Sequence, residues 1–378
     1  MITGEYPPME GGVGAFTREL ARALAAAGHE PHILTDQRAA GAADRGIHHH
    51  PRVQNWNRAF LSGGVGRWLR KIAPAVVNLQ YEAAAFGMSG AVNLAPLWLP
   101  SLPLITTFHD LLPPYLFPKA GGLRQRAVFF LARRSAAVIA TNGADESALR
   151  AAGCQNLRLI PIGSNIPDSP PPDYDRGAWR SRLNTPPQTF LVGYFGFLNA
   201  TKGMDTLLHG VRGALAGVPD LRLLLIGGRT GTSDAANAAI ADAIDGQIAA
   251  LGLGERVIRT GFVDEAAVSA HLHACDTLVL PYSDGVSYRR GSFMAGLAHG
   301  CPIVTTHPRK VLPELHNGEN VTLIPPDDPA ALAATLRTLA ADPDLRSRLG
   351  AGARVLSQRF GWESIAAQTA ALFAETVT

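Results

Sequence analysis

The chain has 378 residues, of which 47% are hydrophobic and 17% are charged. This length predicts two domains, each large enough to bury a core of its own. The composition is typical of a folded chain and excludes a disordered or fibrous protein. The sequence contains no apolar run of about 20 residues, the length that spans a bilayer, and no basic segment followed by an apolar core near its start. We therefore expect a cytoplasmic protein.

The formal net charge of +3 is unevenly distributed. Residues 1–170 contain 16 Lys and Arg against 11 Asp and Glu, a net of +5, which leaves 18 against 20, a net of −2, for the remainder. This basic excess is modest and spread out, which argues against a nucleic-acid-binding protein. The three cysteines, Cys154, Cys275 and Cys301, lack metal-ligand or redox spacing, so we expect buried thiols in a reducing compartment.

A glycine run near the start of the chain is the first candidate for a ligand site. The strand formed by Ile2 and Thr3 is short, and it is followed by Gly4–Pro8 and then by Gly11–Gly14. The run opens a helix that carries its apolar residues on one face and ends at Gly28. Glycine adds no Cβ and lets the backbone approach a phosphate closely. A tight turn without a ligand is the alternative.

Three adjacent histidines follow the next strand. This strand, at 32–35, leads into a polar stretch that we assign to a loop ending with His48–His50. Adjacent side chains in a loop point in different directions, and no carboxylate or cysteine partner has ligand spacing. The sequence therefore predicts no metal site here.

The segment Trp56–Ile72 mixes aromatic and aliphatic residues with arginine and lysine. Basic residues beside interfacial aromatics suit an anionic membrane surface or a lipid-linked acceptor. In that case the protein lies at the inner face of the membrane, held by its basic first domain. An ordinary helix with a solvated basic face is the alternative.

Two further strands, at 75–80 and 104–108, end in the polar groups Gln80–Tyr81–Glu82 and His109–Asp110. The carboxyl ends of parallel strands share one edge of a sheet, and ligands bind at that edge. A histidine there can donate or accept a proton near neutral pH. The alternative for His109 is a purely structural role in orienting a loop.

Strands alternate with helices to the end of the first half of the chain, with a helix at 123–135 and strands at 137–140 and 157–162. This alternation predicts a doubly wound α/β domain over residues 1–167. The proline-rich stretch that follows is typical of an extended chain. We therefore expect a linker at 168–188.

The second domain, expected over 189–361, opens with a strand at 190–195, the loop Gly196–Gly203 and a helix. Lys202 stands at the helix entrance, where its positive charge suits a phosphate. One charge-assisted contact of this kind contributes about 1.5–3 kcal/mol. Later strands end in the loops 227–229 and 261–263.

The stretch 276–306 has the strongest signal of a ligand site. It predicts a strand at 277–281, a polar turn at 283–291, a helix at 292–299 and a second strand at 302–305. The free N–H groups and the dipole of a helix N-terminus favour an anion. The turn is dense in polar residues, namely Asp284, Ser287, Arg289, Arg290 and Ser292.

Together these segments resemble the retaining glycosyltransferases of family 4 over nearly the whole chain. The likeness rests on Gly4–Pro8 with the glycine run, on Gly196–Gly203 with its lysine, and on the stretch 276–306. It implies the GT-B fold, an α/β architecture of two Rossmann-like doubly wound domains facing each other across a cleft. It also implies that a terminal helix at 362–378 crosses back to the first domain. A Rossmann dehydrogenase is disfavoured because no GxGxxG follows a strand.

The resemblance implies a metal-independent, retaining hexosyltransferase of polysaccharide or glycoconjugate biosynthesis. Such an enzyme moves a sugar from a nucleotide diphosphate donor to a carbohydrate, lipid-linked or small-molecule acceptor. The nucleotide sugar is a substrate, and no cofactor is expected. The expected catalytic residues are His109, Asp110 and Asp284, and the expected acceptor-binding residues are Glu5, Tyr6, Gln80 and Tyr81. The expected donor-binding residues are Gly12, Gly14, Gly196, Asn199, Lys202, Gly228, Arg229, Phe262, Val263, Ser287, Arg289, Arg290, Gly291 and Ser292.

Three positions depart from the family pattern. Pro281, Gly300 and Pro302 match it, but the two family glutamates fall on Ser287 and Ala295. Phe197 replaces the arginine of the phosphate loop. A non-catalytic nucleotide-sugar-binding or scaffold homologue is therefore the alternative to an enzyme.

Two residues of the polar turn can compensate for these losses. We hypothesise that Arg289 binds the donor phosphate in place of the missing arginine. We also hypothesise that Asp284 binds sugar hydroxyls in place of the missing carboxylate. A passive loop would need no such dense polar set, so the turn favours transfer over binding alone.

Overall fold

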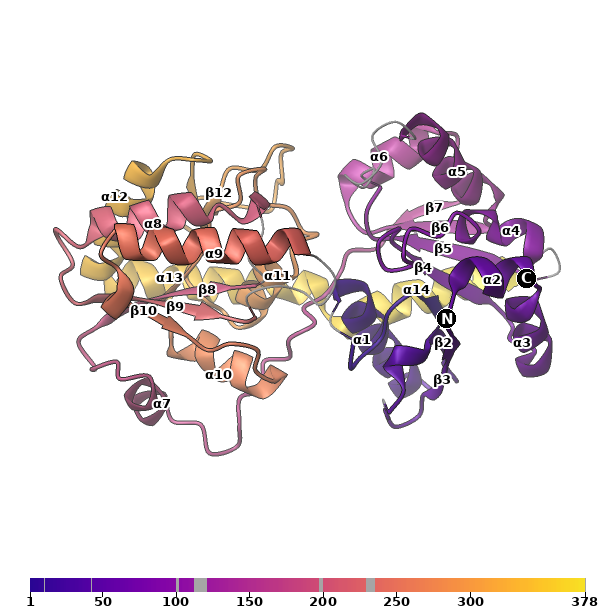
Figure 1. Ribbon diagram of the computed structural model, residues 1–378, viewed down its shortest axis with the longest axis horizontal. Helices are drawn as coiled ribbons and strands as arrows, with labels where there is room; N and C mark the ends of the chain where they lie inside the picture. Colours follow the sequence, from indigo (N-terminus) through magenta and orange to yellow (C-terminus); the bar gives the residue numbers. More distant parts are fainter. Residues whose placement is uncertain are drawn as a thin grey trace. The chain divides into compact units, whose positions relative to one another are not determined.

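The structure, a computed structural model, describes residues 1–9, 11–41, 43–99, 102–111, 121–196, 200–228 and 235–377. The chain forms two compact units (Figure 1). The N-terminal unit comprises Met1–Gly163 and Gly361–Thr378, and the C-terminal unit comprises Ser164–Phe360. Each unit is built around one parallel sheet, which confirms the expected pair of doubly wound α/β domains.

The sheet of the N-terminal unit has seven strands in the order β3-β2-β1-β4-β5-β6-β7, and its neighbouring strands pair in parallel. The central strands β4 and β5 are buried along their whole length, as expected of a parallel sheet covered on both faces. The strands are β1 (Ile2–Thr3), β2 (His32–Asp36), β3 (His48–Val53), β4 (Val77–Tyr81), β5 (Leu104–Phe108), β6 (Ala137–Ala140) and β7 (Leu157–Leu159).

Helices cover both faces of this sheet. They are α1 (Gly12–Ala26), α2 (Trp56–Leu61), α3 (Gly64–Ile72), α4 (Ala95–Trp98), α5 (Gly121–Arg134), α6 (Gly143–Ala151) and α14 (Trp362–Val377). The C-terminal helix α14 packs against α1, so Phe16 and Leu20 share a core with Ile365 and Leu372. A second core cluster, which includes Trp56, lies under α2, α3 and α5.

The histidine stretch is a strand and not the loop that the sequence predicted. His48–His50 belong to β3, which pairs with β2 at the edge of the sheet, with His32 opposite His48. Parallel pairing with β2 supplies the hydrogen bonds of this strand, although its polar sequence shows no apolar alternation. In a strand, alternate side chains share a face, so His48 and His50 lie on one side and His49 on the other.

The sheet of the C-terminal unit has six parallel strands in the order β10-β9-β8-β11-β12-β13. They are β8 (Phe190–Phe195), β9 (Leu221–Ile226), β10 (Val257–Arg259), β11 (Thr277–Leu280), β12 (Ile303–Thr306) and β13 (Thr322–Ile324). The helices are α7 (Arg176–Arg182), α8 (Met204–Ala214), α9 (Ala235–Ala250), α10 (Glu265–Ala274), α11 (Gly291–Ala298), α12 (Pro329–Ala341) and α13 (Pro343–Ser357). Helices α8 and α9 lie on one face of the sheet and α10 on the other (Figure 1).

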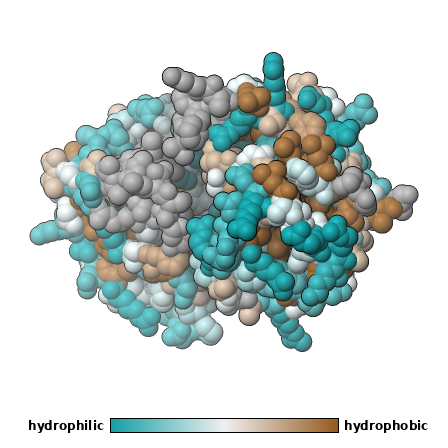
Figure 2. Space-filling view, turned by 45° about the vertical axis from the view of Figure 1, so that its right-hand side comes forward, coloured by the Kyte–Doolittle hydropathy of each residue, from teal (hydrophilic) through white to brown (hydrophobic). Residues whose placement is uncertain are grey.

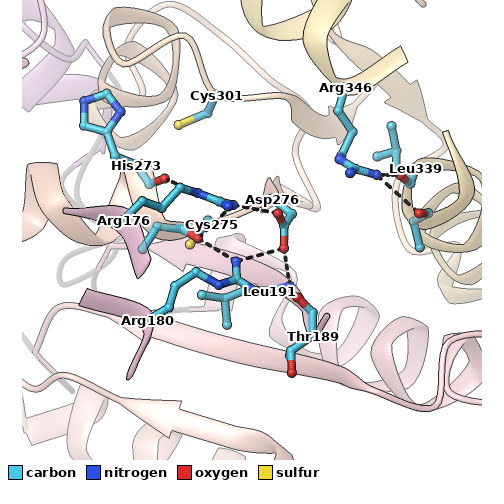
Figure 3. A network of polar contacts seen from close by, with 12 residues as sticks. Arg176, Arg180, Thr189, Leu191, His273, Cys275, Asp276, Cys301, Leu339 and Arg346 are labelled. Atoms are coloured by element: carbon cyan, nitrogen blue, oxygen red, sulfur yellow. Dashed lines mark hydrogen bonds and ion pairs between the residues drawn. The ribbon is translucent and has the colours of Figure 1, made fainter. Parts of the chain in front are cut away.

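The linker expected at 168–188 is not extended throughout, because α7 lies inside it and packs against α10. The Arg180 side chain is only 4% exposed, and its guanidinium donates to Asp276 Oδ2 at 3.1 Å and to the Ala274 carbonyl at 2.9 Å. Arg176 binds the other oxygen of the same carboxylate at 2.7 Å, and Asp276 also accepts the Leu191 N–H at 2.7 Å (Figure 3). These contacts tie α7 to the first residues of β8 and β11, so it is part of the C-terminal unit.

The described helices do not meet the requirements of a membrane span. Among the helices in the described ranges, none combines the length and the hydrophobicity that crossing a bilayer requires. On the face shown in Figure 2, hydrophobic residues form several groups separated by hydrophilic ones.

Candidate functional site

The C-terminal sheet has a topological switch point between β8 and β11. From β8 the chain runs outward to β9 and β10 on one side, and from β11 to β12 and β13 on the other. Ligands of open α/β sheets bind beyond the carboxyl ends of strands at such a point. Here β8 is followed by Gly196, and β11 is followed by Pro281 and Tyr282. Helices α8 and α11 begin after the same two strands, so their positive N-termini lie near the site.

Close packing at Gly203 brings the loop after β8 against the end of β11. Gly203 has a φ of 64°, which glycine adopts more readily than other residues. A Cβ at this position would lie 1.8 Å from the Pro281 carbonyl oxygen. No side chain fits there, and Lys202, the preceding residue, is therefore held beside the end of β11.

Two cations converge on the ring of Tyr282. Lys202 Nζ lies 5.2 Å from the ring centroid, and Arg290 Cζ lies 4.7 Å from it. Cations within about 6 Å of an aromatic face are attracted by the ring quadrupole. The tyrosine itself is buried, and its hydroxyl hydrogen-bonds Ser292 Oγ at 2.7 Å. A residue from the loop before α8 and one from the turn before α11 are thus held in one site.

Arg290 is only partly satisfied by its neighbours. Its guanidinium forms an ion pair with Asp284, and Nη1 donates to Thr201 Oγ1 at 3.4 Å. Arg290 Nε and Ser287 Oγ are both buried, and neither has a hydrogen-bond partner in the part of the chain that the structure describes. Buried polar atoms without partners are uncommon and costly. Both atoms therefore keep unused hydrogen-bonding capacity at this end of the sheet.

The site carries more positive than negative charge. Burial, together with the positive charge of Arg290, lowers the pKa of Lys202 to about 8 against the opposing effect of Asp284. The cluster thus holds two basic groups and one carboxylate. An anion bound here would relieve the repulsion between Lys202 and Arg290, which makes the site suited to a phosphate group.

A second part of the same edge carries an exposed aromatic side chain. Gly227, after β9, forms an isolated bridge with Gly261, and the Gly227 N–H donates to Thr260 Oγ1 at 3.1 Å. The neighbouring side chain of Phe262 is 68% exposed. An exposed aromatic at the carboxyl edge of a sheet provides a surface on which a planar group can stack.

The N-terminal unit uses a carboxylate to cap its first long helix. Glu5 Oε1 accepts the N–H groups of Val13 and Gly14 at 3.0 and 3.1 Å. A Cβ on Gly11 would lie 2.1 Å from the Glu5 carboxyl carbon, so a larger residue there would displace this carboxylate from the helix. Glu5 therefore occupies the N-terminus of α1, where an anion is most stable.

A buried relay of amides orients His109. The Asn78 amide donates to the Ile105 carbonyl at 3.2 Å, so its oxygen is left to accept from the Gln80 amide. The Gln80 oxygen then accepts from His109 Nε2 at 2.8 Å. Because a carbonyl can only accept, the relay fixes the direction of every bond and places the His109 proton on Nε2. Burial lowers the pKa of His109 to about 3, so the ring is neutral, with Nδ1 as an acceptor.

Acidic residues gather at the carboxyl edge of the N-terminal sheet. Glu82 follows β4 directly, and burial together with the negative charges of Glu5 and Asp110 raises its pKa to about 7. Such a carboxyl group can donate or accept a hydrogen bond near neutral pH.

Two family models match the sequence. One, described as Glycosyltransferase Family 4, matches residues 10–166, and the other, described as Glycosyl transferases group 1, matches residues 189–342. The chain belongs to glycosyltransferase family 4. Among the similar proteins is a D-inositol 3-phosphate glycosyltransferase of Xylanimonas cellulosilytica, 27% identical over 401 residues, which make up 97% of this chain and 92% of that one. Another, from Streptomyces bingchenggensis, is 29% identical over 224 residues, 58% of this chain but only 48% of the relative.

Solved structures share the fold of this glycosyltransferase. Sucrose-phosphate synthase from Thermosynechococcus elongatus matches with a TM-score of 0.76 and 24% identity, over 97% of this chain and 93% of that one. Anabaena HepE in complex with UDP and glucose also has a TM-score of 0.76, with 19% identity over 98% of both chains. These matches confirm the GT-B fold.

The glycosyltransferase brings together several of the residues expected to bind its donor. Lys202, Asp284, Arg290 and Ser292 cluster around Tyr282. At the family's second glutamate position, Ala295 is completely buried on α11 and offers no polar group. The expected donor ligands Asn199 and Arg229 lie outside the described residues.

Other expected residues have structural partners in this glycosyltransferase. Tyr6 is 1% exposed and donates to Asp44 Oδ2 at 3.0 Å, and Tyr81 is 2% exposed and hydrogen-bonds Asn93. Their burial disfavours acceptor binding by these two side chains. Gln80 belongs to the histidine relay, and Gly14 gives its N–H to Glu5.

Tyr282 was missed from the sequence, and Glu82 was placed in a polar strand end without an assigned role. Tyr282 follows Pro281, which matches the family pattern. Nothing in the sequence distinguished Tyr282 from an ordinary residue at the end of a strand. Glu82 could have been found from the alternation of side chains along β4, since Gln80 and Glu82 lie on the same side and Tyr81 on the other. That alternation places Glu82 at the polar edge and directs Tyr81 into the core.

Proposed function

We propose that this glycosyltransferase moves a sugar from a nucleoside diphosphate donor to an acceptor hydroxyl, with retention of anomeric configuration and without a metal ion at the reacting diphosphate. The convergence of Lys202 and Arg290 on Tyr282 carries the proposal, because it leaves excess positive charge at the switch point. Two fixed cations supply the charge that a divalent ion would supply to a diphosphate. No cofactor is required.

The same residues account for the departure of the diphosphate. As the bond between the anomeric carbon and the diphosphate oxygen breaks, negative charge grows on the leaving group. Lys202, Arg290 and the N-terminus of α11 stabilise that charge. The acceptor hydroxyl attacks from the face that the diphosphate leaves, and its proton passes to the departing diphosphate oxygen. Asp284 is held by Arg290 and is not placed as a nucleophile, which supports attack by the acceptor itself.

We assign roles in the N-terminal unit by charge and protonation. Neutral His109 offers Nδ1 as a hydrogen-bond acceptor for a sugar hydroxyl, and Asp110 follows it at the end of β5. Glu82 is a better candidate than Tyr6 or Tyr81 for contact with an acceptor, because those tyrosines are buried.

Donor binding tests the proposal. We expect one nucleotide sugar among UDP-, GDP-, ADP- and TDP-glucose to bind in saturation-transfer NMR, and UDP is tested first because HepE was solved with it. Lys202→Ala should weaken that binding by about tenfold or more, roughly 1.4 kcal/mol. Turnover with any acceptor would exclude the non-catalytic alternative. Binding that is unchanged by the substitution would contradict the assigned phosphate site.

The pH dependence of binding identifies the charge on Lys202 as the cause. A bound diphosphate favours protonated Lys202 and raises its pKa above the value of about 8 that it has without ligand. Affinity should therefore be full below pH 8 and fall as the pH rises beyond it. Lys202→Arg should keep its affinity constant to pH 10, because arginine stays protonated. A flat wild-type profile would show that the lysine charge does not contribute.

We also propose that the acceptor, or the membrane that carries it, is anionic. A pocket of about 600 Å³ in the N-terminal unit is lined by Arg52, Arg58, Arg67 and Lys71 and by no acidic residue. The neighbouring Leu61 is 58% exposed. We expect the protein to sediment with vesicles of phosphatidylglycerol and not with phosphatidylcholine, and Arg58→Gln with Arg67→Gln to reduce sedimentation. Equal sedimentation with both lipids would contradict this proposal.

A further inference from the structure

A cluster of histidines and one carboxylate lies at the amino ends of β2 and β3. His32 and His48 are the first residues of these strands and stand opposite each other in the parallel register. Glu30 precedes β2 and reaches both rings. The cluster lies at the end of the strands opposite to the one that carries Glu82 and His109. It has no part in the proposed transfer.

The distances within the cluster fit a metal ion. Glu30 Oε1 lies 3.0 Å from His48 Nε2 and 3.4 Å from His32 Nε2, and the three ligand atoms all lie within 4.8 Å of one another. A tetrahedral zinc ion with bonds of about 2.1 Å holds its ligands about 3.4 Å apart. The rings are nearly parallel, at 12°, with centroids 4.4 Å apart. The half-buried His32 ring can stay in place, and a rotation of the exposed His48 ring with a small shift of the exposed Glu30 would bring all three ligand atoms onto one ion.

We propose that Glu30, His32 and His48 bind a zinc ion, with water as the fourth ligand. Two imidazoles and one carboxylate form a ligand set that suits zinc, and the open position suits a water molecule. The ion would link the edge strand β3 to β2, its only neighbour in the sheet.

A third histidine orients the site. His32 Nδ1 lies 3.2 Å from His50 Nε2, and the His50 ring packs edge-on against Trp68 at 5.2 Å. A histidine ligand commonly donates its other ring N–H to such a partner, which fixes the ring and its tautomer. With Nδ1–H donated to His50, His32 presents Nε2 to the ion.

A similar cluster in the C-terminal unit lacks these properties. Asp168 contacts His273 and also accepts from Arg354 at 2.8 Å, so its charge is already balanced. His299 uses both ring nitrogens, one at 2.8 Å from the Ala295 carbonyl and the other at 2.9 Å from Ser269 Oγ. No nitrogen of His299 is left for an ion. The comparison favours the cluster at β2 and β3.

Metal titration of the full chain without a histidine tag tests the proposal. After treatment with EDTA, cobalt(II) should produce visible absorption bands that saturate at one ion per chain, and zinc should abolish them. His32→Gln and His48→Gln should each weaken zinc binding by about 10–100-fold in calorimetry, and His50→Gln by about tenfold. His209→Gln is the matched control, because His209 is 46% exposed and also contacts a carboxylate. This control should bind zinc as the wild type does.

The melting temperature distinguishes the loss of zinc binding from a general destabilisation of the fold. Zinc should raise the melting temperature of the wild type and of His209→Gln, and leave that of His48→Gln unchanged. His48 is 52% exposed, so the metal-free variant should melt as the metal-free wild type does. Should it melt earlier, Glu30→Gln, at a position 73% exposed, provides the same test. Absence of cobalt bands, or wild-type zinc affinity in both histidine variants, would overturn the proposal.

Discussion

Replacing Arg290 by methionine should lower kcat by about 10²–10³-fold, the effect of removing one group that stabilises charge in a transition state. Methionine keeps the length and apolar contact of the side chain but removes the charge that faces the leaving diphosphate. The site would keep Lys202 but lose its partner on the Tyr282 ring. Single-turnover kinetics at saturating donor would measure the loss directly, because they separate the chemical step from binding.

Two companion variants show which property of Arg290 is used. Arg290→Lys keeps the charge but not the planar guanidinium, so it should recover part of the rate. Arg289→Met distinguishes the neighbouring arginines, because the sequence favoured Arg289 as the phosphate ligand whereas the structure holds Arg290 beside Lys202. A larger loss of kcat in Arg289→Met than in Arg290→Met would reverse our assignment. An increase in KM alone for Arg290→Met would show that the residue binds donor and transition state equally.

Much of the fold could be predicted because buried parallel strands are nearly continuous apolar runs. The expected bounds of β5 and β8 agree with the structure, and both strands are hydrophobic over most of their length. The edge strand β3 was missed for the complementary reason. Its sequence, HHHPRV, has no alternation and a single aliphatic residue, the buried Val53, so pairing with β2 is what makes it a strand.

The candidate site was predicted in composition but not in geometry. The polar turn and Lys202 were found from residue types near glycines, because glycine marks where a backbone must approach closely. Which arginine faces Lys202 depends on the packing of Gly203 against Pro281, a contact between residues far apart in the sequence. The same holds for Tyr282, whose role emerges only when two loops meet on its ring.

The stretch at 168–188 shows how long-range contacts can override local composition. Prolines and short polar residues made it resemble a linker, but Arg180 reaches across 96 positions of sequence to Asp276. A buried arginine with a carboxylate partner belongs to a packed unit rather than to an extended segment. No local sequence pattern predicts a carboxylate partner so far away in the sequence.

Arg180→Met should therefore destabilise the C-terminal unit by about 3–5 kcal/mol, the cost of breaking a buried ion pair by removing one partner. The substitution would leave the Asp276 carboxylate, together with the Ala274 and Thr189 carbonyls, without the guanidinium that they bind now. Asp276 also accepts the N–H of Leu191 in β8, so the destabilisation should extend from α7 into the sheet. Urea denaturation followed by circular dichroism would measure the change.

Arg176→Met is the matched control, because Arg176 binds the same carboxylate from a position where its side chain is 49% exposed. An exposed ion pair contributes about 0–1 kcal/mol, so this variant should unfold close to the wild type. The contrast between the two arginines isolates burial as the cause, since they share one partner and one helix. Equal and small losses in both variants would mean that α7 is held by its apolar contacts alone. In that case residues 168–188 would be a linker whose ion pairs do not stabilise the C-terminal unit.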